Sequence, residues 1–308
     1  MSLLERKSQI AIAEEAEEGT AEDLSAADAI LHMNPSYSPD TPMNGRPVAG
    51  NSMSPYARIP GKRSMTIEFD VELKGSGTAG TAPEFGTALK CCGCSETIVA
   101  DTSVTYEPAS ESIPSATVGL YMDGVLVKIW GARGNVSLAV TTGGIAVLHF
   151  RFVGADFSVT DVAMLSGVSY DATKPPVFLD ASFSIHDYAA KIGSLNIDMN
   201  NVLTLREDPS QASGHFSTLI TDRGPMMSID PETVKVAQAD FFGDLRAGAE
   251  GAVSMSLGAS AGNIATITGP KVQYATISPG SRNGLRSLGI DCAMNRSSGD
   301  DELSIALT

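Results

Sequence analysis

Three of the four cysteines lie close together, at Cys91, Cys92 and Cys94, and the fourth, Cys292, is far along the chain. Clustered thiolates bind zinc or exchange disulfides, but a structural zinc site needs a second pair of ligands at a suitable spacing. No histidine adjoins any cysteine, and the arrangement is poor material for a disulfide framework. The pattern therefore predicts reduced, buried thiols at the end of a helix.

The remaining candidate groups form no catalytic pattern. The histidines are scattered and none lies in a His-x-x-x-His spacing: His32, His149, His186 and His215. Two acidic strings, at residues 14–18 and 299–302, lack the alternating carboxylates of a calcium loop and are expected to be solvated. Neither a phosphate-binding glycine loop nor a nucleophile elbow is present. We therefore predict a protein that is not an enzyme and has no catalytic residues, no cofactor and no metal.

Composition favours strands and turns over long helices. The chain has 308 residues, of which 43% are hydrophobic and only 19% charged, and it contains 30 glycines. Its net charge of −15 disfavours stable binding to nucleic acid, which needs cations to neutralise phosphates. No segment reaches the apolar length of a membrane span, and the acidic N-terminal region does not read as a secretory signal.

The second half of the sequence echoes the first. Three landmarks recur in the same order: Arg63-Ser-Met65-Thr-Ile67 with Arg223-Gly-Pro-Met226-Met227-Ser-Ile229, Pro83-Glu-Phe85-Gly86 with Asp240-Phe-Phe242-Gly243, and Ser103–Tyr106 with Val253–Ser256. A period of about 155 residues is that of a duplicated domain of ordinary size. We therefore expect two copies of one domain.

A diproline, Pro175-Pro176, interrupts both helices and strands and marks the predicted boundary. We predict an N-terminal segment at 1–28, a first β-domain at 29–173 that contains a long loop at 34–64, and a second β-domain at 174–308. Each domain is expected to carry one short flanking helix. The expected fold class is mainly β.

The clearest strand is predicted at residues 64–73, where apolar and polar side chains alternate. One face carries Met65, Ile67, Phe69, Val71 and Leu73, and the other carries Thr66, Glu68, Asp70 and Glu72. The first face is expected to be buried and the second to be acidic and wet.

Other elements follow from shorter patterns. Strands are expected at 9–12, 29–33, 103–106, 115–122, 125–130, 134–141, 144–153, 157–164, 178–186, 194–205, 252–258, 263–268 and 271–277, and short helices at 21–28, 84–93 and 239–248. Residues 286–294 and 302–307 are expected to pair with each other, and 206–224 to form a polar loop.

The loop at 34–64 is rich in proline and glycine. Its six prolines fix φ and remove N–H donors, so they exclude a regular helix or a central strand. A loop of this length inside a compact domain is usually functional or disordered. A solvated, functionless excursion is the alternative interpretation.

Four segments of the chain resemble the tail tube (major tail) proteins of long-tailed bacteriophages: residues 4–20, 71–77, 83–93 and 299–307. The resemblance implies β-sandwich or half-barrel domains with a flanking helix. Subunits would join edge to edge into rings that stack into a hollow tube for the genome. It implies trimeric, pseudo-sixfold rings for a duplicated chain, since single-domain members form rings of six. An exposed sheet edge is a template for another chain, and head-to-tail contacts close into rings or run on as filaments.

The same resemblance implies the partners and the location. The protein would be a homo-oligomer in the virion tail, assembled in the host cytoplasm, and would contact tape-measure, terminator and tail-tip proteins. DNA would pass during genome ejection without specific binding. Two alternatives remain open at this stage: another virion or surface β-sandwich protein such as a decoration, baseplate or adhesin protein, and a hydrolase or lyase on a β-scaffold.

Two sets of residues are candidates for functional surfaces in such a tube. An extended loop can reach a neighbouring ring, and Arg and Tyr are frequent interface anchors. The inter-ring candidates are Pro42, Arg46, Tyr56, Arg58 and Arg63, with residues 1–12 as a second contributor. A conduit must not hold DNA, so an acidic lining is expected. The lumen-facing candidates are Glu68, Asp70 and Glu72, for which exposure to bulk solvent is the alternative.

Overall fold

A computed structural model describes residues 3–308, and the fold is mainly β, as predicted. Residues 1–2 of the predicted N-terminal contact segment lie outside the described residues. The first half contains β1 (Ser8–Glu14), the 3-10 helix η1 (Ala26–Asp28), β2 (Ala29–Ile30), β3 (Met33–Asp40), β4 (Met43–Asn44), β5 (Ile59–Pro60), β6 (Ser64–Glu72), α1 (Gly86–Cys91), β7 (Cys94–Val99), β8 (Ser103–Pro108), β9 (Ala116–Met122), β10 (Val125–Thr141), β11 (Val147–Gly154) and β12 (Asp156–Asp161).

The second half repeats much of this order. It contains β13 (Ser182–Ile185), β14 (Ser194–Asp198), β15 (Val202–Glu207), β16 (His215–Asp222), β17 (Met226–Ile229), α2 (Phe241–Ala247), β18 (Glu250–Leu257), β19 (Ala265–Arg282), β20 (Leu285–Asn295) and β21 (Ser304–Leu307).

Strand pairing in the two halves follows one scheme. In the first half the antiparallel ladders are β1·β9, β9·β10, β10·β12, β10·β11, β11·β6, β6·β3 and β4·β5. In the second half, in the same order, they are β13·β18, β18·β19, β19·β21, β19·β20, β20·β17, β17·β14 and β15·β16. Strands that occupy the same place in the two sets are termed equivalent. The β7·β8 hairpin belongs to the first half alone.

The equivalence extends to single residues. Both long strands, β10 and β19, contain an irregularity at which three residues of the strand lie opposite two residues of its partner. In β10, Ile129 faces Val118 and Ala132 faces Ala116. In β19, Gly269 faces Val253 and Val272 faces Gly251. Counting on from these positions makes Phe152 equivalent to Cys292 and, through their partners, Ile67 to Met227 and Tyr37 to Ile197.

One hydrophobic core runs through both halves, from Ile10 to Leu307. The predicted alternation of 64–73 is confirmed, because Met65, Ile67, Phe69 and Val71 are buried while the polar residues between them are not. Phe69 stacks on Phe150 and Phe152, with ring centroids 5.4 and 6.1 Å away. Burial of these large side chains is the main stabilising contribution at this point.

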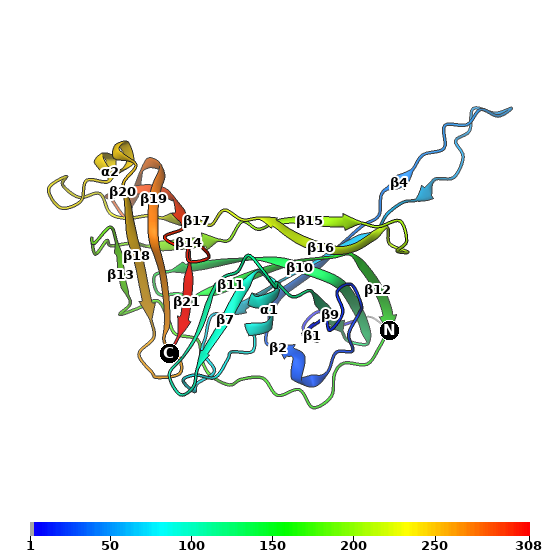
Figure 1. Cartoon of the computed structure of the whole chain (residues 1–308), viewed down its shortest axis with the longest axis horizontal. Helices are drawn as coiled ribbons and strands as arrows, with labels where there is room; N and C mark the ends of the chain where they lie inside the picture. The colour runs from blue at the N-terminus through cyan, green and yellow to red at the C-terminus, as the bar shows by residue number, and fades with distance from the viewer. Residues whose placement is uncertain (1–2) are drawn as a thin grey trace.

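Figure 1 shows how the two equivalent hairpins differ in direction. The β4–β5 hairpin projects from the body and ends in the turn of residues 45–58, whereas β15 and β16 lie across the body. The Thr218 hydroxyl of β16 donates to the Val153 carbonyl at 2.6 Å, and the Thr218 carbonyl accepts from Arg133 at 2.6 Å. These bonds hold the second hairpin down.

Several predicted elements are wrong in detail. The segment 206–224, expected to be a polar loop, contains the end of β15 and the whole of strand β16, in which Ser217 and Thr218 are buried despite their polarity. Residues 286–294 and 302–307 do not pair with each other: an Asn283-Gly284 turn, with φ of 51° and 81°, joins β20 to β19 instead. The helix expected at 21–28 is only the 3-10 turn η1, which Ser25 caps.

Two further corrections concern lengths and repeats. The strand pairs expected at 125–130 and 134–141, and at 263–268 and 271–277, are single long strands, β10 and β19. The third sequence landmark is also wrong, since the equivalent of β18 is β9 and not β8. The boundary at residue 174 stays a prediction.

Candidate functional site

Two ladders join the two halves: β8 pairs with β21, and β10 pairs with β14. The C-terminal part of β10 pairs with β14, the second strand of the second half, from Ser137 opposite Asp198 to Thr141 opposite Ser194. The Met199 N–H donates to the Val136 carbonyl at 3.1 Å, and the Thr142 N–H donates to the Gly193 carbonyl at 2.8 Å. Val136, Leu138 and Val140 are buried as a result.

The equivalent edges have no such partner within residues 3–308. Strand β19 is equivalent to β10, yet beyond Gln273 it pairs only with β20 among the described residues. Strand β3 is equivalent to β14 and pairs there only with β6. Tyr37 of β3 is 46% exposed whereas its equivalent, Ile197, is 3% exposed. The chain therefore has two open strand edges, on β19 and on β3. They are equivalent to the edges of β10 and β14, which already pair with each other inside the chain.

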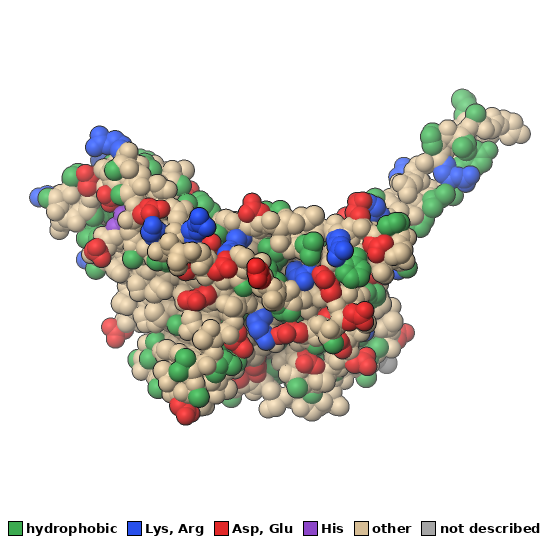
Figure 2. Space-filling model, viewed as in Figure 1, with side chains coloured by type: hydrophobic (Ala, Val, Ile, Leu, Met, Phe, Trp, Pro, Cys, Tyr) green, Lys and Arg blue, Asp and Glu red, His purple; other side chains and the backbone are tan. Residues whose placement is uncertain are grey.

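The projecting arm, defined here as residues 41–60, differs in character from the body. Its turn exposes apolar side chains, among them Met53 and Val48. The Arg46 guanidinium lies over the Tyr56 ring, 5.7 Å from its centroid. The arm contains two cations, Arg46 and Arg58, and no carboxylate, in a chain of net charge −15, so the remainder carries −17. Figure 2 shows this contrast: hydrophobic and basic groups on the arm, carboxylates scattered over the body.

The predicted inter-ring residues divide between the arm and its base. Pro42, Arg46, Tyr56 and Arg58 lie on the arm, where the Pro42 carbonyl accepts a hydrogen bond from Gly61 at 2.8 Å. Arg63 lies at the base instead, with its Nε 2.6 Å from Asp156 Oδ1 and its Nη2 3.0 Å from Oδ2. This bidentate pair, which raises the pKa of Arg63, fastens the base of the arm to β12.

The predicted lumen residues share the polar face of β6. Glu68 pairs with Arg151 at 3.2 Å, and Asp70 lies 2.7 Å from His149 and accepts a bond from Asn34. Glu72 faces Val147 across the ladder. Glu68 is therefore paired with a cation of β11, and Asp70 has a hydrogen-bonding partner on the same strand.

Two other carboxylates of this face, Asp198 and Asp291, were not among the candidates predicted from the sequence. Asp198 accepts a bond from Asn135 across the β10·β14 joint at 2.7 Å. Hydrogen bonds from the hydroxyls of Ser228 and Thr276 lower the pKa of Asp291. The alternation of polar and apolar residues in 288–294, the same signal that identified β6, would have found Asp291.

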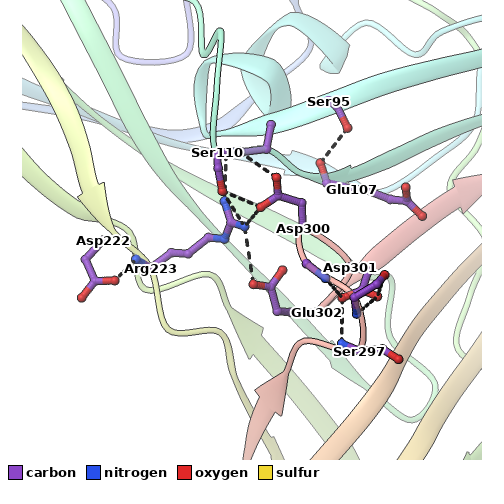
Figure 3. Close-up of polar contacts among 12 residues, drawn as sticks. Ser95, Glu107, Ser110, Asp222, Arg223, Ser297, Asp300, Asp301 and Glu302 are labelled. Carbon is purple, nitrogen blue, oxygen red and sulfur yellow. Dashed lines mark hydrogen bonds and ion pairs between the residues drawn. The ribbon is translucent and has the colours of Figure 1, made fainter.

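A cluster around Arg223, drawn in Figure 3, fixes the C-terminal strand. The guanidinium contacts Asp300 and, at 3.4 Å, Glu302, and it donates to the Ala109 carbonyl at 2.7 Å. A hydrogen bond from Ser110, followed by those from Arg223, lowers the pKa of Asp300. Asp301 accepts backbone N–H bonds from residues 297–299, and the pKa of its carboxyl is lowered for that reason.

The acidic strings are thus structural, and the expectation that they are merely solvated is wrong. Glu15 accepts bonds from the Ser115 hydroxyl and the Gly131 N–H, at 2.6 and 2.7 Å, and Glu18 pairs with Arg133. The cysteines are free and buried, as predicted. Among residues 3–308 no group of three or more His, Cys, Asp and Glu side chains is arranged to hold a metal ion. No helix of that range is long and apolar enough to cross a membrane.

Two like sets of ladders, an open edge at either side and a projecting arm define a structural subunit that assembles through its surfaces. The sequence matches the family described as phage tail tube protein over residues 5–300, and the chain belongs to that family. It is therefore a non-enzymatic structural protein of the virion tail. A comparison with curated proteins finds no match.

Proposed function

We propose that three copies of this chain form a ring with pseudo-sixfold symmetry, and that stacked rings enclose the channel through which the phage genome passes. The observation that carries the proposal is the recurrence of the ladders in both halves. If each half acts as one domain of a six-domain ring, three chains supply the six positions.

The ladder between β10 and β14, which connects the first half to the second, is a template for the contact between subunits. The equivalent contact between subunits is β19 of one copy against β3 of the next. In the equivalent register Pro279 faces Tyr37 of the next copy as Leu138 faces Ile197, and Ser278 faces Ser38 as Ser137 faces Asp198. Such a head-to-tail contact forms a ring of three when each copy is rotated by a third of a turn relative to the last.

A cysteine pair tests this register. Ser38 and Ser278 are exposed and would lie on the same face of neighbouring strands. We expect the Ser38→Cys, Ser278→Cys double variant to form disulfides between subunits and to run as a covalent trimer on non-reducing gels. Each single variant is the control and should stay monomeric on the gel. Rings of three without the cross-link would reject the register, and stable monomers or rings of six would reject the trimer.

The polar face of the β6–β11–β10–β14–β17–β20 sheet is the proposed lining of the channel. Its carboxylates, including Glu68, Asp70, Glu72 and Asp291, repel a polyanion, while Arg151 moderates the charge. A ring structure in which Glu68, Asp70 and Glu72 all face outward would reject this assignment.

The arm is the proposed contact between stacked rings. It is basic and partly apolar, whereas the rest of the chain is acidic, so it complements the body of another copy. Pro42, Arg46, Tyr56 and Arg58 remain the proposed contact residues, and residues 1–12 the second contributor. At the ends of the tube the same surfaces would meet the tape-measure, terminator and tail-tip proteins.

A further inference from the structure

The turn between β10 and β11 makes a further contact between the two halves, beyond the end of the β10·β14 ladder. The Gly143 N–H donates to the Phe178 carbonyl at 3.1 Å, and the Phe178 N–H donates to the Gly144 carbonyl at 2.8 Å. Next to these bonds, Ile145 forms an isolated antiparallel bridge with Val177. The turn of the first half is therefore held against the segment that precedes β13 in the second half.

The turn between β19 and β20 is the equivalent turn of the second half. Leu285 is equivalent to Ile145, because they lie three residues before equivalent leucines, Leu288 of β20 and Leu148 of β11. The turn itself, residues 283–284, is shorter than residues 142–144, so the equivalence holds for the flanking side chains and not for the bonds of the turn. Leu285 is 56% exposed. The hairpin therefore carries an exposed apolar side chain at the end of the edge that we assign to the ring contact.

The segment before β1 is the equivalent of the segment before β13. Strands β1 and β13 pair with the equivalent strands β9 and β18 in the same register, so that Ile12 is equivalent to Ile185. Eight residues before these two lie Leu4 and Val177. Leu4 is therefore the counterpart of the residue that Ile145 contacts inside the chain, and it is 56% exposed.

Leu4 lies in an apolar groove of about 340 Å³ that borders the open edge of β3. Six apolar residues from the segment before β1, from β3 and from β9 contribute to its lining: Leu3, Leu4, Pro35, Tyr37, Leu120 and Met122. The Leu4 N–H donates to the Asp123 carboxylate at 3.1 Å, and Lys7 pairs with the same carboxylate at 3.2 Å, so this wall of the groove is fixed to the β9–β10 turn. An apolar groove beside an open strand edge can receive a side chain of an added strand.

We infer that Leu285 of one copy inserts into this groove of the next copy and contacts Leu4, as Ile145 contacts Val177 inside the chain. The inference rests on the proposed ring, in which antiparallel pairing of β19 with β3 brings the β19–β20 turn to the start of β3. The register of β3 is irregular there, between Met33 and Ser36. Burial of two exposed leucines stabilises the contact at the point where the main-chain pairing is least regular.

This role of Leu4 within a ring is additional to the contact between rings proposed for residues 1–12. It also assigns the groove to one partner, which is the hairpin turn of a second copy of this chain.

The first test compares Leu285→Asp with the wild type by sedimentation and native mass spectrometry over a dilution series. The matched control is Ile98→Asp, because Ile98 lies near the end of β7 and is 51% exposed. We expect Leu285→Asp to weaken association of subunits at least roughly tenfold, since it removes the burial of a leucine and places a carboxylate in an apolar groove. The control should associate like the wild type. Wild-type association of the Leu285→Asp variant would overturn the inference and leave the ring standing.

A charge exchange tests whether Leu4 is the partner. Leu4→Lys alone should weaken association as Leu285→Asp does. The double variant places opposite charges against each other across the contact, and we expect it to associate several times more tightly than either single variant. A double variant that associates no more tightly than Leu285→Asp would overturn the contact between these two residues. A wild-type chain that stays monomeric would refute the ring itself, which is a distinguishable result.

Discussion

Arg63 and Arg223 form the same ion pair in the two halves of the chain. Arg63 precedes β6 and pairs with Asp156 at the start of β12, while Arg223 lies before β17 and pairs with Glu302 just before β21. Strands β6 and β17 are equivalent, as are β12 and β21. The two arginines are 160 residues apart, and each lies four residues before an equivalent pair, Ile67 and Met227. In each half the ion pair links the start of one sheet strand, β6 or β17, to the start of the last strand of that half, β12 or β21.

The two pairs should differ in their contribution to stability. The Arg223 side chain is 15% exposed and contacts two carboxylates, whereas that of Arg63 is 41% exposed. We expect Arg223→Ala to lower the free energy of unfolding by about 2 kcal/mol, because it leaves Glu302 without its cation. Arg63→Ala should cost less than about 1 kcal/mol. Chemical denaturation of both variants measures the difference, and equal losses would contradict it.

Shortening the arm should separate ring formation from tube formation. Replacing residues 45–58 by an Asn-Gly turn joins β4 directly to β5 and removes only exposed side chains from the turn. We expect folded chains and single rings with an unchanged melting temperature, but no long tubes in electron micrographs. The control is Asn51→Ala, which should polymerise normally. Long tubes from the shortened chain would show that the arm is a solvated excursion.

Gly131 should be intolerant of a side chain. It has a φ of 58° at the irregularity of β10, its N–H donates to Glu15, and a Cβ there would lie 3.1 Å from the Phe216 carbonyl oxygen. A left-handed conformation costs a non-glycine residue about 1–2 kcal/mol. Gly131→Ala should therefore destabilise the chain by at least about 1 kcal/mol in thermal unfolding. Gly224→Ala, where a Cβ meets nothing within 4 Å, is the control and should be close to neutral.

The four thiols should be inert in the folded protein. Burial raises the pKa of Cys91, Cys94 and Cys292 to about 12, and that of Cys92 well above its usual value. Since the thiolate is the reactive form, we expect negligible reaction with a disulfide reagent at pH 8 and full reaction after unfolding.

The raised pKa values of the same thiols predict that the stability of the folded chain depends on pH. The folded chain holds these protons above the pH at which the unfolded chain releases them, near pH 9. Their contribution to stability is therefore present below pH 9 and is lost as the pH rises toward 12. The unfolded Cys292→Ser variant should react at three thiols, one fewer than the unfolded wild type. Rapid labelling of the native wild type would contradict the assignment of all four thiols as buried.

The sequence by itself determined what depends on local pattern. The alternation at 64–73 identified β6 and its buried face, because a strand places successive side chains on opposite sides. Two of the three repeated landmarks identified equivalent elements, since β6 and β17, and α1 and α2, keep similar residues at their starts. The short helices expected at 84–93 and 239–248 are confirmed as α1 and α2.

Only the tertiary structure decided which strands pair and which edges stay open. β21 follows β20 in the chain but pairs with β19 and β8, and such choices depend on contacts between residues far apart in sequence. The local sequence does not indicate that Glu15 and Asp300 form hydrogen bonds and ion pairs with distant residues, or that Arg63 pairs with Asp156.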